Sequence, residues 1–272
     1  MPRLYTVDFC LLIPHYNNVS GLLASLQTVV YSRPFLVLVV DDGSVAPPDE
    51  KTLSQQLPQG FPLVIVYLPQ NAGITAALNA GLQWMKQHCI TQFVARLDCG
   101  DVCTRDRFTA QVEYMQVHPQ VGLLGSWCRF ETDTAGGGYL HKTVTQPKDV
   151  WRHMHLRNII IHPTVMLRTT LLQQVPLYPT AYPHAEDYAF FWQLMQYTQA
   201  AVLPQVLVTC RLTVTGLSGR HRKEQLRSVR KVISRYGVDT WLQLVGVLRT
   251  HIREITPFWL INRLKMYQKA RE

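Results

Sequence analysis

The chain has 272 residues, 47% of them hydrophobic and 17% charged, a balance that predicts a folded protein and excludes a disordered one. No stretch approaches the roughly 18 consecutive apolar residues that a membrane-spanning helix requires, and the N-terminus lacks the apolar core of a signal peptide. The six cysteines include no Cys-x-x-Cys pair, so neither a zinc site nor a disulfide framework is indicated. We therefore expect a cytoplasmic protein.

The net charge of +9 is concentrated near the C-terminus. From Arg211 onward there are 14 basic and 4 acidic residues, a charge of +10, whereas the preceding residues have 13 and 14, a charge of −1. This asymmetry divides the chain into a domain at residues 1–211 and a basic helical extension at residues 212–272. The extension predicts contact with an anionic surface, and a solvated pair of basic helices is the alternative.

Apolar strands and amphipathic helices alternate along the first hundred residues. Strands are predicted at 7–13, 35–40, 62–68 and 93–97, and helices at 18–29, 47–57 and 73–88. Such alternation indicates βαβ units and a mostly parallel sheet. Further along, helices are predicted at 105–118 and 186–197, and strands at 121–131, 158–167 (interrupted at His162-Pro163) and 201–212, before a helical remainder.

Two pairs of acids follow predicted strands. Asp41 and Asp42 end the second strand, and Asp98 and Asp101 follow the fourth. Because ligands bind beyond the carboxyl ends of parallel strands, all four carboxylates are expected in one crevice. Their mutual repulsion requires a cation or hydrogen-bond donors among them, so a polar, metal-bearing ligand is predicted.

An acid after the second strand is also typical of dinucleotide-binding and methyl-donor folds. Those folds need a glycine-rich turn after the first strand, whereas residues 14–18 here read Pro-His-Tyr-Asn-Asn. A Walker-type phosphate loop is absent as well. A bound nucleotide would therefore be held by carboxylates and a cation rather than by a glycine cradle.

Several short motifs occur together in this order. They are Pro14-His15-Tyr16-Asn17, Asp41-Asp42-Gly43-Ser44, Asn71-Ala72-Gly73, Arg96-Leu97-Asp98-Cys99-Gly100-Asp101, His162-Pro163-Thr164 and Glu186-Asp187. With them, roughly the first two hundred residues resemble family 2 glycosyltransferases of the GT-A fold, which build bacterial surface polysaccharides and lipopolysaccharide from nucleotide sugars. The resemblance implies an α/β, Rossmann-like fold, with a mostly parallel sheet flanked by helices.

The resemblance also implies a donor site and a metal site. Its donor-binding residues would be Pro14, Tyr16, Asp42, Asn71, Gly73, Arg96, Asp98, Arg211 and Arg220. A divalent cation, Mn²⁺ or Mg²⁺, would be bound by Asp98, Asp101 and His162. Gly100 stands where the family usually has its central metal-binding aspartate, so Asp101 or water is expected to complete the shell.

Inverting sugar transfer needs a general base for the acceptor hydroxyl. The family position implies Asp187 as this base, with Glu186 in reserve, and His162 and Thr164 on the acceptor side. The alternative for both acids is that they only favour a helix N-terminus through its dipole.

The predicted reaction moves a sugar from a nucleotide donor, a UDP-sugar by preference, to a lipid-linked saccharide. The mixed apolar and basic extension fits an anionic membrane surface, which would place the enzyme peripherally on the inner face of the cytoplasmic membrane; packing onto the domain or a second copy is the alternative. No nucleic-acid partner is expected, and the oligomeric state stays open. The rival functions are a sugar nucleotidyltransferase and a non-catalytic saccharide-binding protein.

Overall fold

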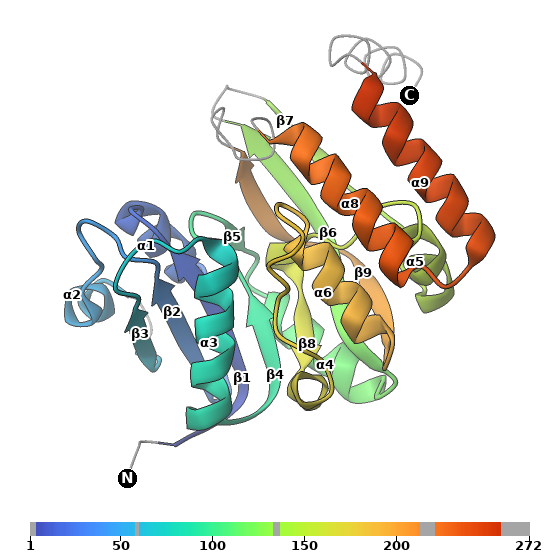
Figure 1. The fold of residues 1–272 in the computed structure, drawn as a ribbon. Coiled ribbons are helices and arrows are strands. Elements are labelled where there is room, and N and C mark those ends of the chain that lie inside the picture. Colours follow the sequence, from blue (N-terminus) through green and yellow to red (C-terminus); the bar gives the residue numbers. More distant parts are fainter. Residues whose placement is uncertain (1–3, 58–59, 133–136, 213–220, 257–272) are drawn as a thin grey trace.

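The computed structural model describes residues 4–57, 60–132, 137–212 and 221–256. Within these residues one nine-stranded sheet runs through the molecule in the order β3-β2-β1-β4-β8-β6-β9-β5, and β7 pairs with β6 beside this path (Figure 1). The strands are β1 (Tyr5–His15), β2 (Phe35–Asp41), β3 (Leu63–Tyr67), β4 (Cys89–Arg96), β5 (Val102–Cys103), β6 (Val121–Thr132), β7 (Gly138–His141), β8 (Met166–Arg168) and β9 (Gln199–Leu212).

The first four strands of that order are all parallel. Every residue of β2 is buried, as expected for a strand covered on both faces. The short strand β8 lies antiparallel between β4 and β6, and β6 and β9 are again parallel. The predicted α/β architecture is confirmed, and the carboxyl ends of β1, β2 and β4 lie at one edge of the sheet.

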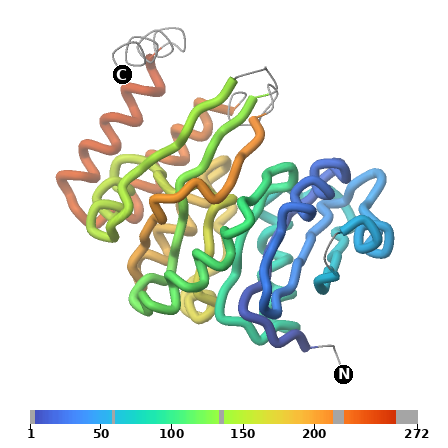
Figure 2. The backbone as a smooth tube through the Cα atoms, turned by 180° about the vertical axis from the view of Figure 1, so that it is seen from behind, coloured from blue at the N-terminus to red at the C-terminus, as the bar shows by residue number. Residues whose placement is uncertain are grey.

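Helices cover both faces of the sheet (Figures 1 and 2). They are α1 (Val19–Leu26), α2 (Glu50–Gln55), α3 (Ile74–His88), α4 (Arg107–Val117), α5 (Pro147–Met154), α6 (Glu186–Met195), α8 (Arg222–Tyr236) and α9 (Thr240–Ile255), with 3₁₀ turns η1 (His162–Thr164) and η2 (Thr169–Gln173). Helices α3, α5, α6 and α8 contribute to one apolar core, and α1, α2 and α4 to the other. The two cores hold the sheet rigidly between them.

The segment at 158–167 differs from its predicted strand. It forms the 3₁₀ turn η1, and only Met166–Arg168 pairs with the sheet. Pro163 has no N–H to donate to a ladder, which explains why pairing begins after it. Helix α5 was not predicted. It has only eight residues, and because Val150 and Met154 are its only buried residues, its apolar periodicity is too short to indicate a helix.

The basic extension begins against the domain rather than apart from it. Val232 and Ile233 of α8 are fully buried in the core that α6 shares, and α9 packs on the outer side of α8 (Figure 1). The predicted apolar and basic residues of the tail beyond Thr256 lie outside the described residues.

Candidate active site

A cleft of about 610 Å³ opens between the start of α3 and the start of α6. Its lining includes Gly73, Asp98, His162, His184, Glu186 and Asp187. These side chains come from four separated parts of the chain, and Asp98 follows the carboxyl end of β4. The cleft therefore lies at the sheet edge where the acidic pairs are expected.

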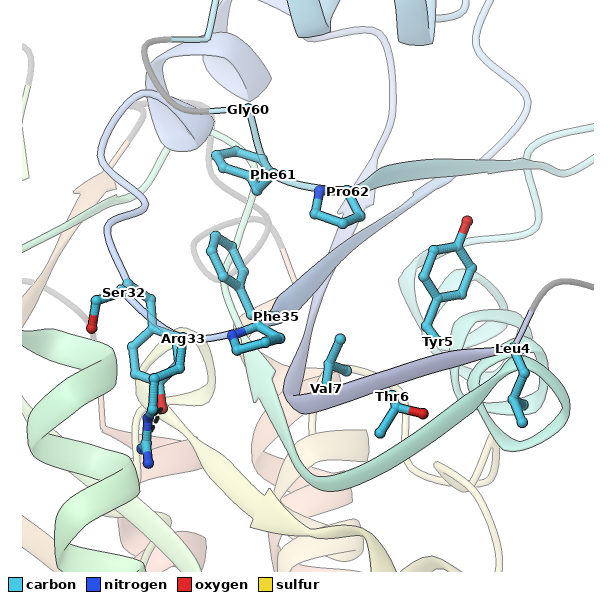
Figure 3. Close-up of a pocket in the computed structure, with 12 residues that line it drawn as sticks. Leu4, Tyr5, Thr6, Val7, Ser32, Arg33, Phe35, Gly60, Phe61 and Pro62 are labelled. Carbon is cyan, nitrogen blue, oxygen red and sulfur yellow. Dashed lines mark hydrogen bonds between the residues drawn. The ribbon is translucent and has the colours of Figure 1, made fainter.

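A second cavity, of about 480 Å³, lies at the opposite edge of the sheet, where β1, β2 and β3 begin (Figure 3). The positively charged side chain in its lining is Arg33. It donates a hydrogen bond to the Tyr31 hydroxyl, and its Nε lies 2.9 Å from Asp8 Oδ2. This charge is already compensated within the protein, and the acids of the sequence motifs are not among the lining residues. We therefore assign the candidate active site to the first cleft.

Asp42 organises the loop that enters the cleft. Its carboxylate accepts hydrogen bonds from Asn71 Nδ2 at 3.0 Å, from the Ala72 N–H at 2.9 Å and from the Gly73 N–H at 2.8 Å. Gly73 has a φ of +88°, a conformation that suits glycine, and it caps α3. Asp42 is buried and holds the floor of the cleft, so its oxygens are occupied by the loop rather than directed at a base or ribose.

Asp41 is equally engaged inside the protein. Its Oδ1 lies 2.7 Å from His15 Nδ1 and accepts a hydrogen bond from the Ser44 hydroxyl at 2.6 Å. Two predicted donor-binding residues flank His15, the last residue of β1. Pro14 is buried in the sheet, whereas the Tyr16 side chain is about half exposed and is not among the residues that line the cleft. Asp41 thus faces away from the ligand space that the four-carboxylate prediction gave it.

Arg96 lies beneath the cleft, with only 2% of its surface exposed. Its Nη1 donates to the Leu97 carbonyl at 2.6 Å, and its Nη2 lies 2.5 Å from Asp98 Oδ1. Arg96 is not among the lining residues of the cleft, and its contact with a donor diphosphate stays a prediction. Arg96 acts as a buried counter-charge to the acids, and its Nε and Nη2 make no hydrogen bond of good geometry within the described part of the chain.

The two acids after β4 have different environments. The Asp98 side chain is 39% exposed and faces the cleft. Asp101 is buried, and its Oδ1 accepts the Arg211 N–H at 2.9 Å. Burial, reinforced by the charge of Asp98, raises the pKa of Asp101 to about 7. Asp101 therefore accepts a backbone hydrogen bond at the end of β9 and is not among the lining residues of the cleft, and its role as a metal ligand stays a prediction.

A divalent cation nevertheless fits this cleft. Mg²⁺ and similar ions are commonly bound by one or two carboxylates together with phosphate oxygens of a substrate and water. Asp98 supplies such a carboxylate, because its side chain is 39% exposed and lines the cleft although its Oδ1 is paired with Arg96. Of the three predicted ligands, Asp98 and His162 line the cleft and Asp101 does not, and the metal site stays a prediction.

The two predicted acceptor residues are also separated by the structure. His162 lines the cleft, and its Nε2 lies 2.9 Å from the Tyr178 hydroxyl. Burial, together with the charge of Arg96, lowers the pKa of His162 well below its usual value, so the ring is neutral. Thr164 has no exposed surface, and its hydroxyl donates to the Ile161 carbonyl at 2.7 Å. Thr164 therefore does not line the cleft, and its contact with an acceptor stays a prediction.

Glu186 and Asp187 begin α6 and both line the cleft. Burial, followed by the charge of Glu186, raises the pKa of Asp187 to about 7, and burial also raises the pKa of Glu186. Asp187 Oδ2 accepts a hydrogen bond from Asn158 Nδ2 at 2.9 Å, and Oδ1 accepts the Tyr188 N–H at 2.7 Å. These bonds orient a carboxylate that can exchange a proton near neutral pH.

Asn158 was not predicted as a site residue. It is the first residue of a β-branched segment for which a strand was predicted, and no contact was predicted for its side chain. Of the two predicted arginines, Arg211 is exposed at the end of β9 and contributes its backbone N–H to Asp101, while Arg220 lies outside the described residues.

Comparison with known proteins gives a consistent result. The sequence model of glycosyl transferase family 2 matches residues 10–172. The amylovoran biosynthesis glycosyltransferase AmsE of Erwinia amylovora is 29% identical over 275 residues, which cover 97% of this chain and 99% of AmsE. The UDP-Gal:alpha-D-GlcNAc-diphosphoundecaprenol beta-1,3-galactosyltransferase of Escherichia coli is 27% identical over 214 residues, or 76% of this chain and 75% of the relative.

Solved structures show the same fold at low sequence identity. TarS of S. aureus in complex with UDP-GlcNAc superposes with a TM-score of 0.62 at 19% identity, over 90% of this chain and 73% of that one. The mannosyltransferase PcManGT of Pyrobaculum calidifontis, in complex with GDP-Man and Mn²⁺, has a TM-score of 0.59 at 17% identity, over 99% and 82% of the two chains. The predicted GT-A fold is confirmed by these likenesses.

Proposed function

The chain belongs to glycosyl transferase family 2, and we propose that it is an inverting enzyme that moves one sugar from a UDP-sugar to a lipid-linked saccharide. One observation above all supports this proposal. A carboxylate suited to a cation and a diphosphate, Asp98, shares one cleft with a carboxylate of near-neutral pKa, Asp187. Displacement of a diphosphate from a sugar requires both functions at once.

In the proposed reaction Asp187 takes the proton of the acceptor hydroxyl as that oxygen attacks the anomeric carbon. Its Oδ2 is held by Asn158, which aligns the carboxylate while leaving its remaining lone pairs available. Glu186 is the reserve candidate for the same role. A divalent cation bound at Asp98 would neutralise the charge that develops on the leaving diphosphate. Attack on the side opposite the leaving group inverts the anomeric centre.

The donor is proposed to be UDP-linked because the Escherichia coli relative is named for UDP-Gal and the TarS complex contains UDP-GlcNAc. The loop that Asp42 fixes, Asn71 to Gly73, would form the floor beside the donor, with Tyr16 outside it. The rival nucleotidyltransferase would use a glycine-rich, basic loop after β1, and residues 14–18 provide none.

We expect a UDP-sugar, with Mn²⁺ present, to raise the melting temperature more than dTDP-, GDP- or CMP-sugars do. A ligand selective for the native state at a hundred times its Kd stabilises by about 2.7 kcal/mol, which corresponds to a shift of about 5–10 °C for a chain of this size. The measurement is a thermal-shift screen with and without the cation. A shift with a free oligosaccharide but with no nucleotide sugar would favour the saccharide-binding alternative.

The acceptor is proposed to be lipid-linked because α9 has an exposed apolar face. This apolar stripe consists of Trp241, Leu244, Leu248, Ile252 and Ile255, which are between 50% and 71% exposed. The spacing of three and four residues aligns them on one side of the helix. Arg249 and Arg253, which are also exposed, each follow a stripe residue and so point about 100° around the helix from it. Such a face fits the headgroup region of an anionic membrane.

The opposite side of α9 is small and tightly packed. Gly246 and Thr250 are buried, and a Cβ added to Gly246 would lie 2.0 Å from the His155 carbonyl oxygen. The helix therefore turns its apolar side outward, the reverse of an ordinary surface helix. Within the described residues no helix combines the length and apolar character needed to cross a bilayer. We propose that α9 lies along the inner face of the cytoplasmic membrane.

The stripe is linked to the cleft through α8. Arg230 Nη1 donates to Glu254 Oε2 at 2.5 Å, which joins the end of α9 to α8. Gln225, one turn into α8, lines the cleft and donates to the His184 carbonyl at 3.1 Å. A membrane against the stripe would thus lie near the cleft, where a lipid-linked acceptor must arrive.

Leu244→Glu with Leu248→Glu should weaken sedimentation with anionic liposomes at least tenfold, because each leucine buried in the interface contributes about 1.5–3 kcal/mol. Both side chains point away from the domain, so the fold should be retained. Val117→Glu, at an even more exposed apolar position ending α4, is the control. Equal sedimentation of the double variant and the native chain would exclude the stripe as the membrane contact.

A further inference from the structure

Three side chains of metal-binding type meet at the rim of the cleft. They are His184, which lines the cleft, and His221 and Glu224, which lie at the start of α8. One ligand atom from each lies within 4.8 Å of the other two. None of the three has a role in the sugar transfer proposed above.

Two of the three distances in this trio match those of ligands that share an ion. Glu224 Oε2 lies 3.5 Å from His184 Nε2 and 3.5 Å from His221 Nδ1. Hydrogen bonds of this kind are about 2.7–3.2 Å long, so neither contact is a good hydrogen bond. Around a tetrahedral ion with bonds of about 2.0–2.2 Å, ligand atoms lie about 3.3–3.6 Å from each other. Both spacings at Glu224 fall in that range.

The backbone holds the two halves of the trio together. His184 has a φ of +61°, one of two positive values among the described residues other than glycine. Such a conformation is strained for a histidine and persists where the surroundings impose it. Here the His184 carbonyl accepts a hydrogen bond from Gln225, beside Glu224. The His184 and His221 rings stack nearly parallel, with centroids 4.5 Å and planes 18° apart, so one ring has to turn before both nitrogens point at the same ion.

Two described positive charges, Arg222 and Lys223, adjoin Glu224 in the chain. Arg222 Nη2 donates to the Arg253 carbonyl at 2.5 Å and is directed to α9. Lys223 is exposed to solvent. Within the described residues, His221 and Glu224 are themselves exposed to solvent.

We propose that His184, His221 and Glu224 bind one divalent transition-metal ion of the zinc class, at a site distinct from the cation site at Asp98. Two imidazole nitrogens and one carboxylate oxygen are a ligand set that zinc prefers, whereas the oxygen ligands at Asp98 suit Mg²⁺ or Mn²⁺. Three protein ligands leave a fourth position for water or a phosphate oxygen. The bound ion links the first turn of α8 to the segment that precedes Asp187. This inference does not depend on the proposed transfer reaction.

The test is titration of the tag-free, full-length chain with Co²⁺ alone, followed by displacement with Zn²⁺. We expect one Co²⁺ per chain with visible d–d bands, no thiolate charge-transfer band, and stoichiometric displacement by Zn²⁺. Glu224→Gln and His221→Gln should each weaken Zn²⁺ binding at least tenfold and remove the rise in melting temperature that Zn²⁺ causes. Both residues are exposed, and circular dichroism is the check that each variant is folded.

Two matched variants serve as controls. His251→Gln changes another exposed histidine of the extension, and Asp98→Asn changes the other cation site; neither should alter Zn²⁺ affinity. Equal Zn²⁺ binding by the native chain and Glu224→Gln would overturn the proposal. So would loss of binding in Asp98→Asn, or a thiolate band, which would assign the ion to a cysteine.

Discussion

Asp187→Asn is expected to lower the rate of sugar transfer by about 10²- to 10⁴-fold, the usual contribution of a general base, while donor affinity stays within about twofold. The amide keeps the shape of the side chain but cannot take a proton from the acceptor hydroxyl. Single-turnover transfer and donor titration measure the two quantities separately. Asp149→Asn, which changes an aspartate in the first turn of α5, is the matched control and should retain the native rate.

The assignment of Asp187 as the general base also predicts how kcat/KM of sugar transfer depends on pH. Only the deprotonated carboxylate can act as base, and its pKa is about 7, so kcat/KM should fall about tenfold per pH unit below pH 7. Glu186→Gln removes a negative charge that raises the pKa of Asp187. In this variant the fall of kcat/KM should therefore begin at a lower pH, while activity is retained. Loss of activity in Glu186→Gln together with a near-native rate in Asp187→Asn would transfer the role of base to Glu186.

Asp98→Asn is expected to weaken donor binding at least tenfold in the presence of Mn²⁺ and to weaken Mn²⁺ binding with it, because one carboxylate serves both. The isosteric amide limits the disturbance of Arg96, whose Nη2 lies 2.5 Å from Asp98. Calorimetric titration of UDP with and without Mn²⁺ measures the coupling between the two ligands. Unaltered titrations would show that the cation and the diphosphate bind elsewhere.

Asp101→Asn distinguishes the two acids of the same motif. Its Oδ1 accepts the Arg211 N–H, and an amide oxygen can accept the same bond. We therefore expect Mn²⁺ and donor affinities to stay near native values in this variant. A loss equal to that of Asp98→Asn would restore Asp101 to the metal shell.

Much of the N-terminal half of the fold was predictable because its signals are local. The buried run at β2, the acids that end it and the helical spacing of α3 are all readable within a few residues. The C-terminal half was less predictable, since β8 is only three residues long and η1 replaces a predicted strand. Short segments such as these are stabilised by partners remote in sequence.

By itself, the sequence determined the order of strands and helices and the motifs that place Asp98 and Asp187 at element ends. Only the tertiary structure decided which of the motif side chains reach the cleft. Arg96 and Thr164 belong to the same motifs, yet both are buried and bonded to backbone groups. The direction of a side chain at a strand end depends on pairing register and on packing against distant segments, and a local pattern includes neither.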